Sequence, residues 1–211
     1  MSGSFDSPSR VPVFGVTSDN LEIGRIQGQQ LAALLPKGGT ALHIQGPSGT
    51  DAAQLPKLRI EGMQETRPAA IQIKAIKGSW TEASAFKAVT SWLRLSTSQQ
   101  SHIHVVAAQN DAMAVGAKKE LREFAVEGAE RDRWLSIPFL GCDGVSKTGQ
   151  AWVRSGILAA TVIAPPLAGQ ALEMLTHALQ TQTAPQELTL VAPRSFPALE
   201  SLAARSQPTK I

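Results

Sequence analysis

The stretch IHVVAAQNDAMAVGA, residues 103–117, decides the fold. Its first six residues, 103–108, form a largely apolar run of strand length, which is typical of a parallel strand buried on both faces. Three polar residues, Gln109, Asn110 and Asp111, follow at once. Ligands of parallel sheets bind beyond the carboxyl ends of the strands. The stretch therefore predicts a buried strand and also the edge of the sheet where a site should lie.

Outward from this stretch, short apolar runs alternate with segments of helical spacing along nearly the whole chain. The other predicted strands are 13–16, 41–45, 71–76, 135–140, 158–163 and 188–191. Predicted helices are 21–35, where Gly24 and Gly28 on one side permit close packing, 82–93, with Thr81 as its N-cap, and 166–179. The alternation predicts an α/β fold, a three-layer parallel sheet with helices on both faces.

Composition narrows the classes of function. The 211 residues carry a formal net charge of only +3, and the basic residues are scattered, which gives no support to nucleic-acid binding. No apolar run approaches the length of a transmembrane helix. The single cysteine, Cys142, excludes an internal disulfide. Residues 1–10 are polar, are expected to be flexible and show no signal region, so we expect either a cytosolic chain or a mature or truncated form.

Polar and small residues follow the predicted strands. They form the segments 17–20, 46–51, 77–80, 109–111 and 141–144. Short amides and carboxylates, together with Trp80, the one tryptophan in these segments, suit a ligand that carries hydroxyl groups. Each Asp or Asn taken alone is more often the cap of the next helix. The joint pattern favours a binding site.

These same segments resemble one protein family. QNDAMAVGA at 109–117 is similar to the QNDxMAxGA segment of ribose-binding proteins, LGCDG at 140–144 to their GxDG strand end, and GILAAT at 156–161 to their GxLxAT. Residues 18–20 with Gly24 and Gly28 resemble the family's second hinge crossing, and 45–53 its GT loop. The matches fall in one order between residues 13 and 191. The chain thus resembles type I periplasmic sugar-binding proteins, whose fold lactose-repressor-type effector domains share.

The resemblance implies a set of ligand-binding residues. Trp80 matches the aromatic residue that covers the sugar ring, and Asn110 and Asp143 match the amide and carboxylate that bind ring hydroxyls. Arg59 matches the arginine of the family's R-x-x-G segment. Cys142 stands where a further aromatic residue is expected. Ala164 stands where the family has a glutamine. Both differences imply a site less polar than that of ribose-binding proteins, and therefore a sugar or polyol other than ribose.

The resemblance also implies a domain organisation. The family has two lobes around a cleft, and this chain matches the C-terminal lobe, with most of the N-terminal lobe missing. The expected segments are a flexible 1–10, a ligand-binding lobe 11–163, a helix of the missing lobe at 164–187, and a third crossing with the C-terminal tail at 188–211. The apolar stripe of helix 166–179 would then be open to a second copy, so we expect a homo-oligomer. Because one lobe provides only half of the cleft, we also expect weak sugar binding.

The expected function is a non-catalytic carbohydrate-binding receptor for an ABC-type sugar uptake system. Its partners would be a sugar or polyol and the ABC transporter membrane subunits, with no cofactor and no nucleic acid, in the periplasm by resemblance or otherwise in the cytoplasm. Two alternatives are an effector domain of a lactose-repressor-type regulator and an interaction module without ligand. A regulator needs a helix-turn-helix, which residues 1–10 cannot supply.

Enzymatic motifs are incomplete. GPSGT at 46–50 approaches the nucleophile elbow G-x-S-x-G but ends in threonine, so we expect no hydrolase activity at Ser48. His102 and His104 would share a strand face as a metal-binding pair, yet no third ligand is near in sequence. The thiol of Cys142 has an acidic neighbour, which raises rather than lowers its pKa. The sequence therefore predicts a protein that is not an enzyme.

Overall fold

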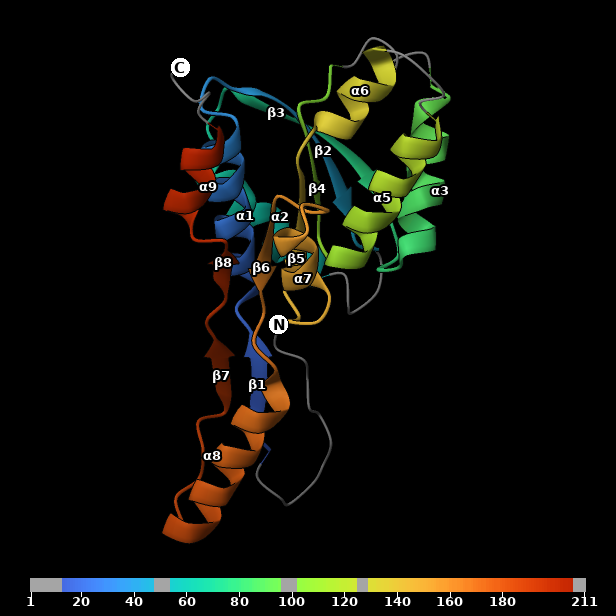
Figure 1. Cartoon of the computed structure of the whole chain (residues 1–211). Helices are drawn as coiled ribbons and strands as arrows, with labels where there is room; N and C mark the ends of the chain where they lie inside the picture. Colours follow the sequence, from blue (N-terminus) through green and yellow to red (C-terminus); the bar gives the residue numbers. More distant parts are fainter. Residues whose placement is uncertain (1–12, 48–53, 96–101, 125–128, 207–211) are drawn as a thin grey trace.

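Strands and helices alternate along the chain (Figure 1). The computed structural model describes residues 13–47, 54–95, 102–124 and 129–206. Ser48 and most of the loop around it lie outside the described residues. The elements are β1 (Gly15–Ser18), α1 (Asn20–Leu34), β2 (Gly39–Gln45), α2 (Gln54–Thr66), β3 (Ile71–Lys77), α3 (Glu82–Leu93), β4 (Val105–Ala108), α5 (Asp111–Phe124), α6 (Ala129–Ser136), β5 (Phe139–Asp143), α7 (Gly149–Arg154), β6 (Ala160–Ile163), α8 (Leu167–Thr181), β7 (Leu188–Val191), β8 (Arg194–Phe196) and α9 (Leu199–Ser206).

The main sheet has six strands in the order β3-β2-β4-β5-β6-β8. Its first five strands are parallel neighbours, and β8 joins the edge antiparallel to β6. A second sheet consists of β1 and β7 alone, paired in parallel. The predicted α/β class is confirmed, with a mostly parallel sheet between two layers of helices.

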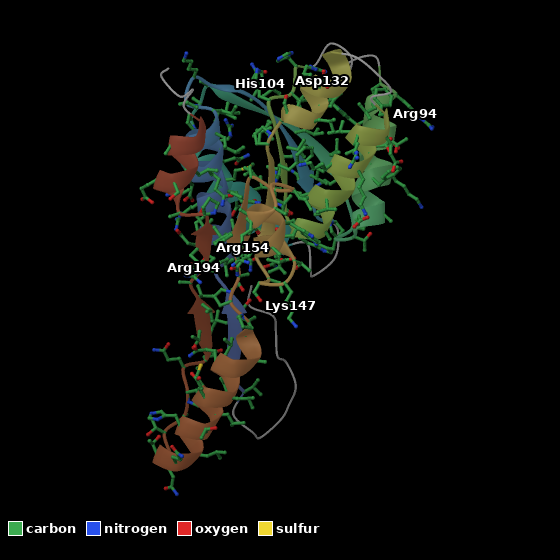
Figure 2. All side chains as sticks on the ribbon, viewed as in Figure 1. Arg94, His104, Asp132, Lys147, Arg154 and Arg194 are labelled. Atoms are coloured by element: carbon green, nitrogen blue, oxygen red, sulfur yellow. The ribbon has the colours of Figure 1, made fainter. Side chains whose placement is uncertain are left out.

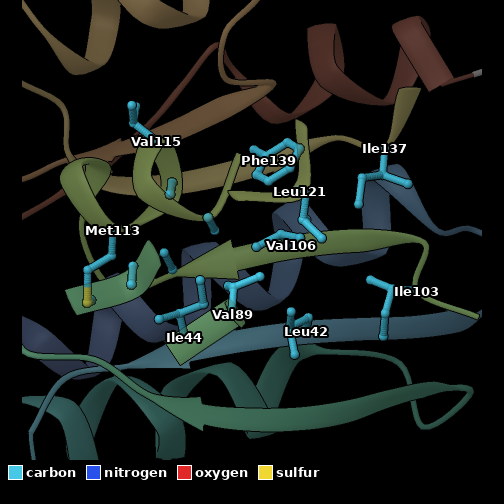
Figure 3. Packing of buried hydrophobic residues seen from close by; sticks show 14 of the residues in the cluster. Leu42, Ile44, Val89, Ile103, Val106, Met113, Val115, Leu121, Ile137 and Phe139 are labelled. Atoms are coloured by element: carbon cyan, nitrogen blue, oxygen red, sulfur yellow. The ribbon is translucent and has the colours of Figure 1, made fainter. Parts of the chain in front are cut away.

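Apolar residues are buried on both faces of the main sheet. Successive residues of a strand point to opposite faces, so Val105 and Ala107 of β4 enter one cluster and Val106 and Ala108 the other. One cluster packs β2 and β4 against α3, α5 and α6 (Figure 3). The other packs the opposite face against α1, α2 and α9. Burial on both faces explains why the strands read as continuous apolar runs.

Helices α1 and α2 pack backbone against backbone. A methyl group at Gly24 would collide with the carbonyl oxygen of Arg59, and one at Gly62 would collide with that of Leu21. A methyl group at Gly28 would likewise collide with α2. The close packing predicted from Gly24 and Gly28 is confirmed. It fixes the position of α2, and hence of Arg59, relative to α1.

The predicted strand 135–140 is wrong in its first half. Helix α6 continues to Ser136, and β5 begins only at Phe139. The apolar run is divided because Trp134, on the helix, packs its ring edge-on against Trp92, with 6.3 Å between ring centroids. Pro138 then favours an extended conformation at Ile137. Periodicity alone cannot separate such a buried helix end from a strand.

The C-terminal part holds more structure than the sequence predicts. The predicted helix 166–179 is α8, and Figure 1 shows it extending away from the main sheet beside β1 and β7. Residues 188–211, expected as a crossing and tail, also include β8 and α9. Leu202 of α9 is 1% exposed and packs in the same cluster as Leu31 of α1. Both elements were missed because a three-residue strand and an eight-residue helix carry little periodicity.

Candidate ligand-binding site

The carboxyl ends of β2, β3, β4 and β5 lie at one edge of the sheet, because these strands are parallel neighbours. Trp80 follows β3, Asn110 follows β4, and Asp143 is the last residue of β5. Arg59 reaches the same edge from α2, since its Nη1 donates a hydrogen bond of 2.5 Å to the carbonyl oxygen of Gln109. The structure thus brings the four predicted residues together.

Arg59 is the central cation of this cluster. It is 9% exposed, and its guanidinium carbon lies 5.7 Å from the centroid of the Trp80 ring. Its Nε donates to Oδ1 of Asn20 at 2.9 Å. Pro56 lies between the GT loop and Arg59 in the sequence. In the structure it belongs to the first turn of α2, where proline is tolerated.

Trp80 is half-buried and adopts a positive φ of 64°. Its ring lies directly over Gly46, where a Cβ atom would overlap the ring. The glycine that follows β2 therefore makes room for the indole. The indole in turn presents an aromatic surface beside Arg59, as stacking on an apolar sugar face requires.

Asn110 caps α5 and also ties two strand ends together. Its Oδ1 accepts a hydrogen bond of 2.8 Å from the backbone N–H of Met113, while its Nδ2 donates at 2.8 Å to the carbonyl oxygen of Trp80. The capping role that is commonest for such residues is therefore present. A primary amide carries two N–H groups, and the second one of Asn110 finds no acceptor among the described residues, so it is available to a ligand.

Asp143 is the least satisfied polar group of the cluster. Its φ is 101°, a conformation that L residues rarely adopt, and its side chain is half-buried. Burial raises the pKa of its carboxyl group to about 6, although the positive charge of Arg59 acts to lower it. Within the part of the chain that the structure describes, its carboxylate accepts no hydrogen bond and forms no ion pair with Arg59.

Three further residues hold the site together, and sequence reasoning assigned them no separate role. Gln109 is fully buried, accepting from the N–H of Gly46 and donating to the carbonyl oxygen of Pro56. Asp111 accepts from the N–H of Gly144 and from the hydroxyl of Thr161, and burial raises its pKa to about 7. Asn20 is the third. In the sequence these three residues are marked only by their position next to strand ends. That position does not indicate which groups they contact.

Of the residues considered for catalysis or metal binding, Cys142, His102 and His104 lie in the part of the chain that the structure describes. Cys142 is fully buried, and burial raises the pKa of its thiol to about 12, so no thiolate nucleophile forms near neutral pH. The rings of His102 and His104 are 4.7 Å apart. Figure 2 shows His104 at the opposite end of the lobe from Lys147, which follows β5. The described residues contain no cluster of three metal-ligating side chains.

A cavity of about 500 Å³ lies at the other edge of the sheet, away from the four residues. It is lined by residues at the amino ends of β5 and β6, among them Phe139 and Leu158, and by Lys118 of α5. The ammonium group of Lys118 already donates to the carbonyl oxygens of Gly156 and Ile157. The volume of a cavity therefore does not by itself identify the binding site. The polar groups at the carboxyl edge of the sheet indicate it instead.

Among the helices that the structure describes, none has the length and apolar character that crossing a membrane would require.

The fold and this site define a class of protein. Residues 3–183 match the family described as periplasmic binding protein domain, which is most of the chain. The chain therefore belongs to the periplasmic binding protein family.

Two curated relatives come from Escherichia coli. The ribose import binding protein is 30% identical over 151 residues, which cover 72% of this chain and 46% of that protein. The galactofuranose-binding protein is 26% identical over 178 residues, or 83% of this chain and 54% of that protein. The chain thus spans about half the length of the curated relatives it matches.

Solved structures show the same fold. The Caulobacter myo-inositol binding protein, bound to myo-inositol, superimposes with a TM-score of 0.71 at 19% identity over 95% of this chain and 66% of that one. A solute binding protein of an ABC transporter from Actinobacillus succinogenes, with bound D-allose, gives 0.70 at 21% identity over 92% and 64%. At this identity the likeness concerns the fold alone.

Proposed function

We propose that this chain is a carbohydrate-binding lobe of a solute receptor that serves an ABC-type sugar uptake system, and that it is not an enzyme. Its ligand is a sugar or polyol bound by Trp80, Asn110, Asp143 and Arg59. The names of the relatives, one for ribose import and one for galactofuranose binding, support this assignment. The description of the family as a periplasmic binding protein domain supports the periplasm as its compartment. The D-allose-bound structure, which is described as an ABC transporter periplasmic solute binding protein, supports transporter membrane subunits as its partners. These binding proteins give no support to a lactose-repressor-type regulator.

The observation that carries the proposal is the half-buried carboxylate of Asp143, which accepts no hydrogen bond from the residues that the structure describes. A half-buried carboxylate without hydrogen bonds is costly, and strained residues of this kind cluster at ligand sites. A ligand hydroxyl placed between Asp143 and Arg59 would donate to the former and accept from the latter. Such charge-assisted hydrogen bonds are stronger than neutral ones.

The remaining groups suit the other parts of a sugar ring. The Trp80 ring provides an apolar surface for one face of the ring, and the free N–H of Asn110 provides a donor for a further hydroxyl. The lobe offers these groups on one side only. Water therefore competes for each of them, and we expect the affinity of the chain by itself to be weak, with dissociation constants near the millimolar range.

An NMR titration of the whole chain tests the proposal. The ¹H–¹⁵N spectrum would be followed while D-ribose, D-allose, D-galactose, D-fructose and myo-inositol are added in turn. We expect at least one of them to shift the indole signal of Trp80 and the amide signals of Asn110 and Asp143. Asp143→Asn should then weaken binding about 5- to 150-fold, since a lost partner in a buried hydrogen bond costs about 1–3 kcal/mol.

Asp132→Asn is the matched control. Asp132 lies on α6 at the far end of the lobe (Figure 2) and is exposed, so its substitution should leave the affinity unchanged. If no ligand of the panel shifts these signals, the proposed class of ligand is wrong. If Asp143→Asn and the wild type bind equally well, Asp143 does not belong to the site.

A further inference from the structure

The orientation of Arg59 depends on two fixed acceptors. An arginine side chain has many rotamers, and burying it in one of them costs conformational entropy. Here Nε donates to Oδ1 of Asn20 at 2.9 Å, and Nη1 donates to the carbonyl oxygen of Gln109 at 2.5 Å. Because the guanidinium group is planar, two fixed donors define its plane and its direction. Nη2 makes no hydrogen bond within the described residues and stays available to a ligand.

Asn20 is itself held in one orientation. It is 6% exposed, and its Nδ2 donates to the carbonyl oxygen of Ser18 at 2.9 Å. An amide rotated by half a turn would lose this bond and place its NH₂ group against the guanidinium, donor against donor. The carbonyl oxygen of Ser18 therefore determines that Oδ1 of Asn20 is directed at Arg59.

The amide of Asn20 is not needed to cap α1. Asp19 provides the cap, since its carboxylate accepts a hydrogen bond of 2.9 Å from the N–H of Glu22. The two neighbouring residues thus have separate tasks. Asp19 stabilises the first turn of the helix, and Asn20 contacts Arg59.

We propose that Asn20 is a positioning residue, which sets the affinity for the ligand by orienting Arg59 without contacting the ligand itself. This inference rests on the proposed function and deepens it. Asn20 begins α1, and only Asp19 separates it from β1, the strand that pairs with β7 outside the main sheet. The acceptor that orients Arg59 therefore comes from the junction between β1 and the first helix that packs on the main sheet.

A measurement without ligand tests the orientation directly. The Nε–H of Arg59, assigned with the variant Arg59→Met, should exchange slowly with water because it is buried and hydrogen-bonded. Asn20→Ala should speed up this exchange at least about tenfold. Asp19→Ala, the matched control, removes the cap and lowers stability, but it should leave the exchange of the Arg59 Nε–H near the wild-type rate.

A double-mutant cycle then tests the effect on binding. With the sugar or polyol that gives the largest shifts, Asn20→Ala should weaken affinity about 3- to 10-fold, whereas Asp19→Ala should change it less than about twofold. In the Arg59→Met background, Asn20→Ala should have no further effect on affinity. A loss that persists in that background, or one that Asp19→Ala reproduces, would overturn the positioning role.

The two proposals fail in different ways. If the wild type binds no member of the panel, the proposed function fails, and the exchange measurement still decides whether Asn20 orients Arg59. If sugars bind but the exchange of the Arg59 Nε–H is unchanged by Asn20→Ala, the positioning role is wrong and the proposed function stands.

Discussion

At the scale of single residues, backbone strain and the candidate site coincide. Three non-glycine residues in the described part of the chain have a positive φ, and two of them, Trp80 and Asp143, are predicted site residues. Both stand where a strand end turns towards a helix. Strain of this kind persists only when the surroundings enforce it. For Asp143 the surroundings include Asp111, whose carboxylate holds the N–H of the next residue, Gly144.

The raised pKa of Asp143 gives a pH-dependent stability. Its folded pKa is about 6 against an ordinary value of 3.8, so at pH values well below 3.8 the carboxyl group is protonated in both states and costs nothing. As the pH rises through about 6, the folded protein must hold a partly buried charge, and stability is lost. Relative to Asp143→Asn, the free energy of unfolding of the wild type should fall by about 1–3 kcal/mol between about pH 4 and pH 7, with solvent screening reducing the full shift.

Urea unfolding of both proteins at several pH values provides the check. The difference between them is the useful quantity, because other groups titrate in the same window. Burial lowers the pKa of His43 to about 4, so its contribution runs in the opposite sense and is lost as the pH falls. Burial raises the pKa of Asp111, so its contribution runs in the same sense as that of Asp143. A difference that does not change with pH would show that Asp143 is not buried as described.

At the scale of elements, the contact between α1 and α2 places Arg59. The two helices approach so closely that glycine is required at Gly24, Gly28 and Gly62. The hydroxyl of Thr66 adds a hydrogen bond of 2.7 Å to the carbonyl oxygen of Arg25 across the same contact. Ordinary side chains at these positions would separate the helices and move α2 away from the strand ends.

Gly62→Ala should therefore lower the free energy of unfolding by roughly 1–3 kcal/mol, the usual effect of overpacking. The matched control is Gly169→Ala in α8, where an added Cβ meets nothing within 4 Å. That change should be neutral or should stabilise the protein by up to about 1 kcal/mol, because alanine is the better helix former. Chemical denaturation measures both. Equal effects of the two substitutions would contradict a tight contact between α1 and α2.

The sequence predicted those elements whose pattern is local. Helix 82–93, its Thr81 cap and strand 188–191 were predicted at their observed bounds, since periodicity and capping residues are read directly from the chain. The division of 135–140 between α6 and β5 depended on the packing of Trp134, which no window of sequence contains. In the site, strand ends and family resemblance indicated four residues that do lie together. The hydrogen bonds of Asn20 and Gln109 to Arg59 span 39 and 50 residues, and only the folded chain reveals them.

At the scale of the whole molecule, α8, β1 and β7 form an extension beside the main sheet (Figure 1). None of the residues of α8 is buried. Leu172, Leu175 and Leu179 are 63%, 44% and 73% exposed, and Leu188 and Leu190 of β7 are about half exposed. Exposed apolar surfaces of this kind mark sites of association.

We expect the chain to associate with a second copy through α8. Size exclusion with light scattering should give a mass above the 22.4 kDa of the monomer, and the mass should rise with concentration. Leu172→Gln together with Leu179→Gln should restore the monomer, because both residues belong to the exposed apolar stripe. A mass of one chain at every concentration would contradict association, and α8 would then stand alone in solution.

The single thiol of the chain reports how often helix α1 separates from the sheet. Cys142 lies on β5 with no exposed surface, and its neighbours in the sheet are β4 and β6. Its side chain packs against Ile23 and Ile26 of α1 and Val162 of β6, so a thiol reagent can modify it only during excursions that separate α1 from the sheet, and the modification rate under native conditions measures the free energy of that opening. Because no other cysteine competes, the same reaction, followed with and without a sugar, would report ligand binding as a slower modification of Cys142.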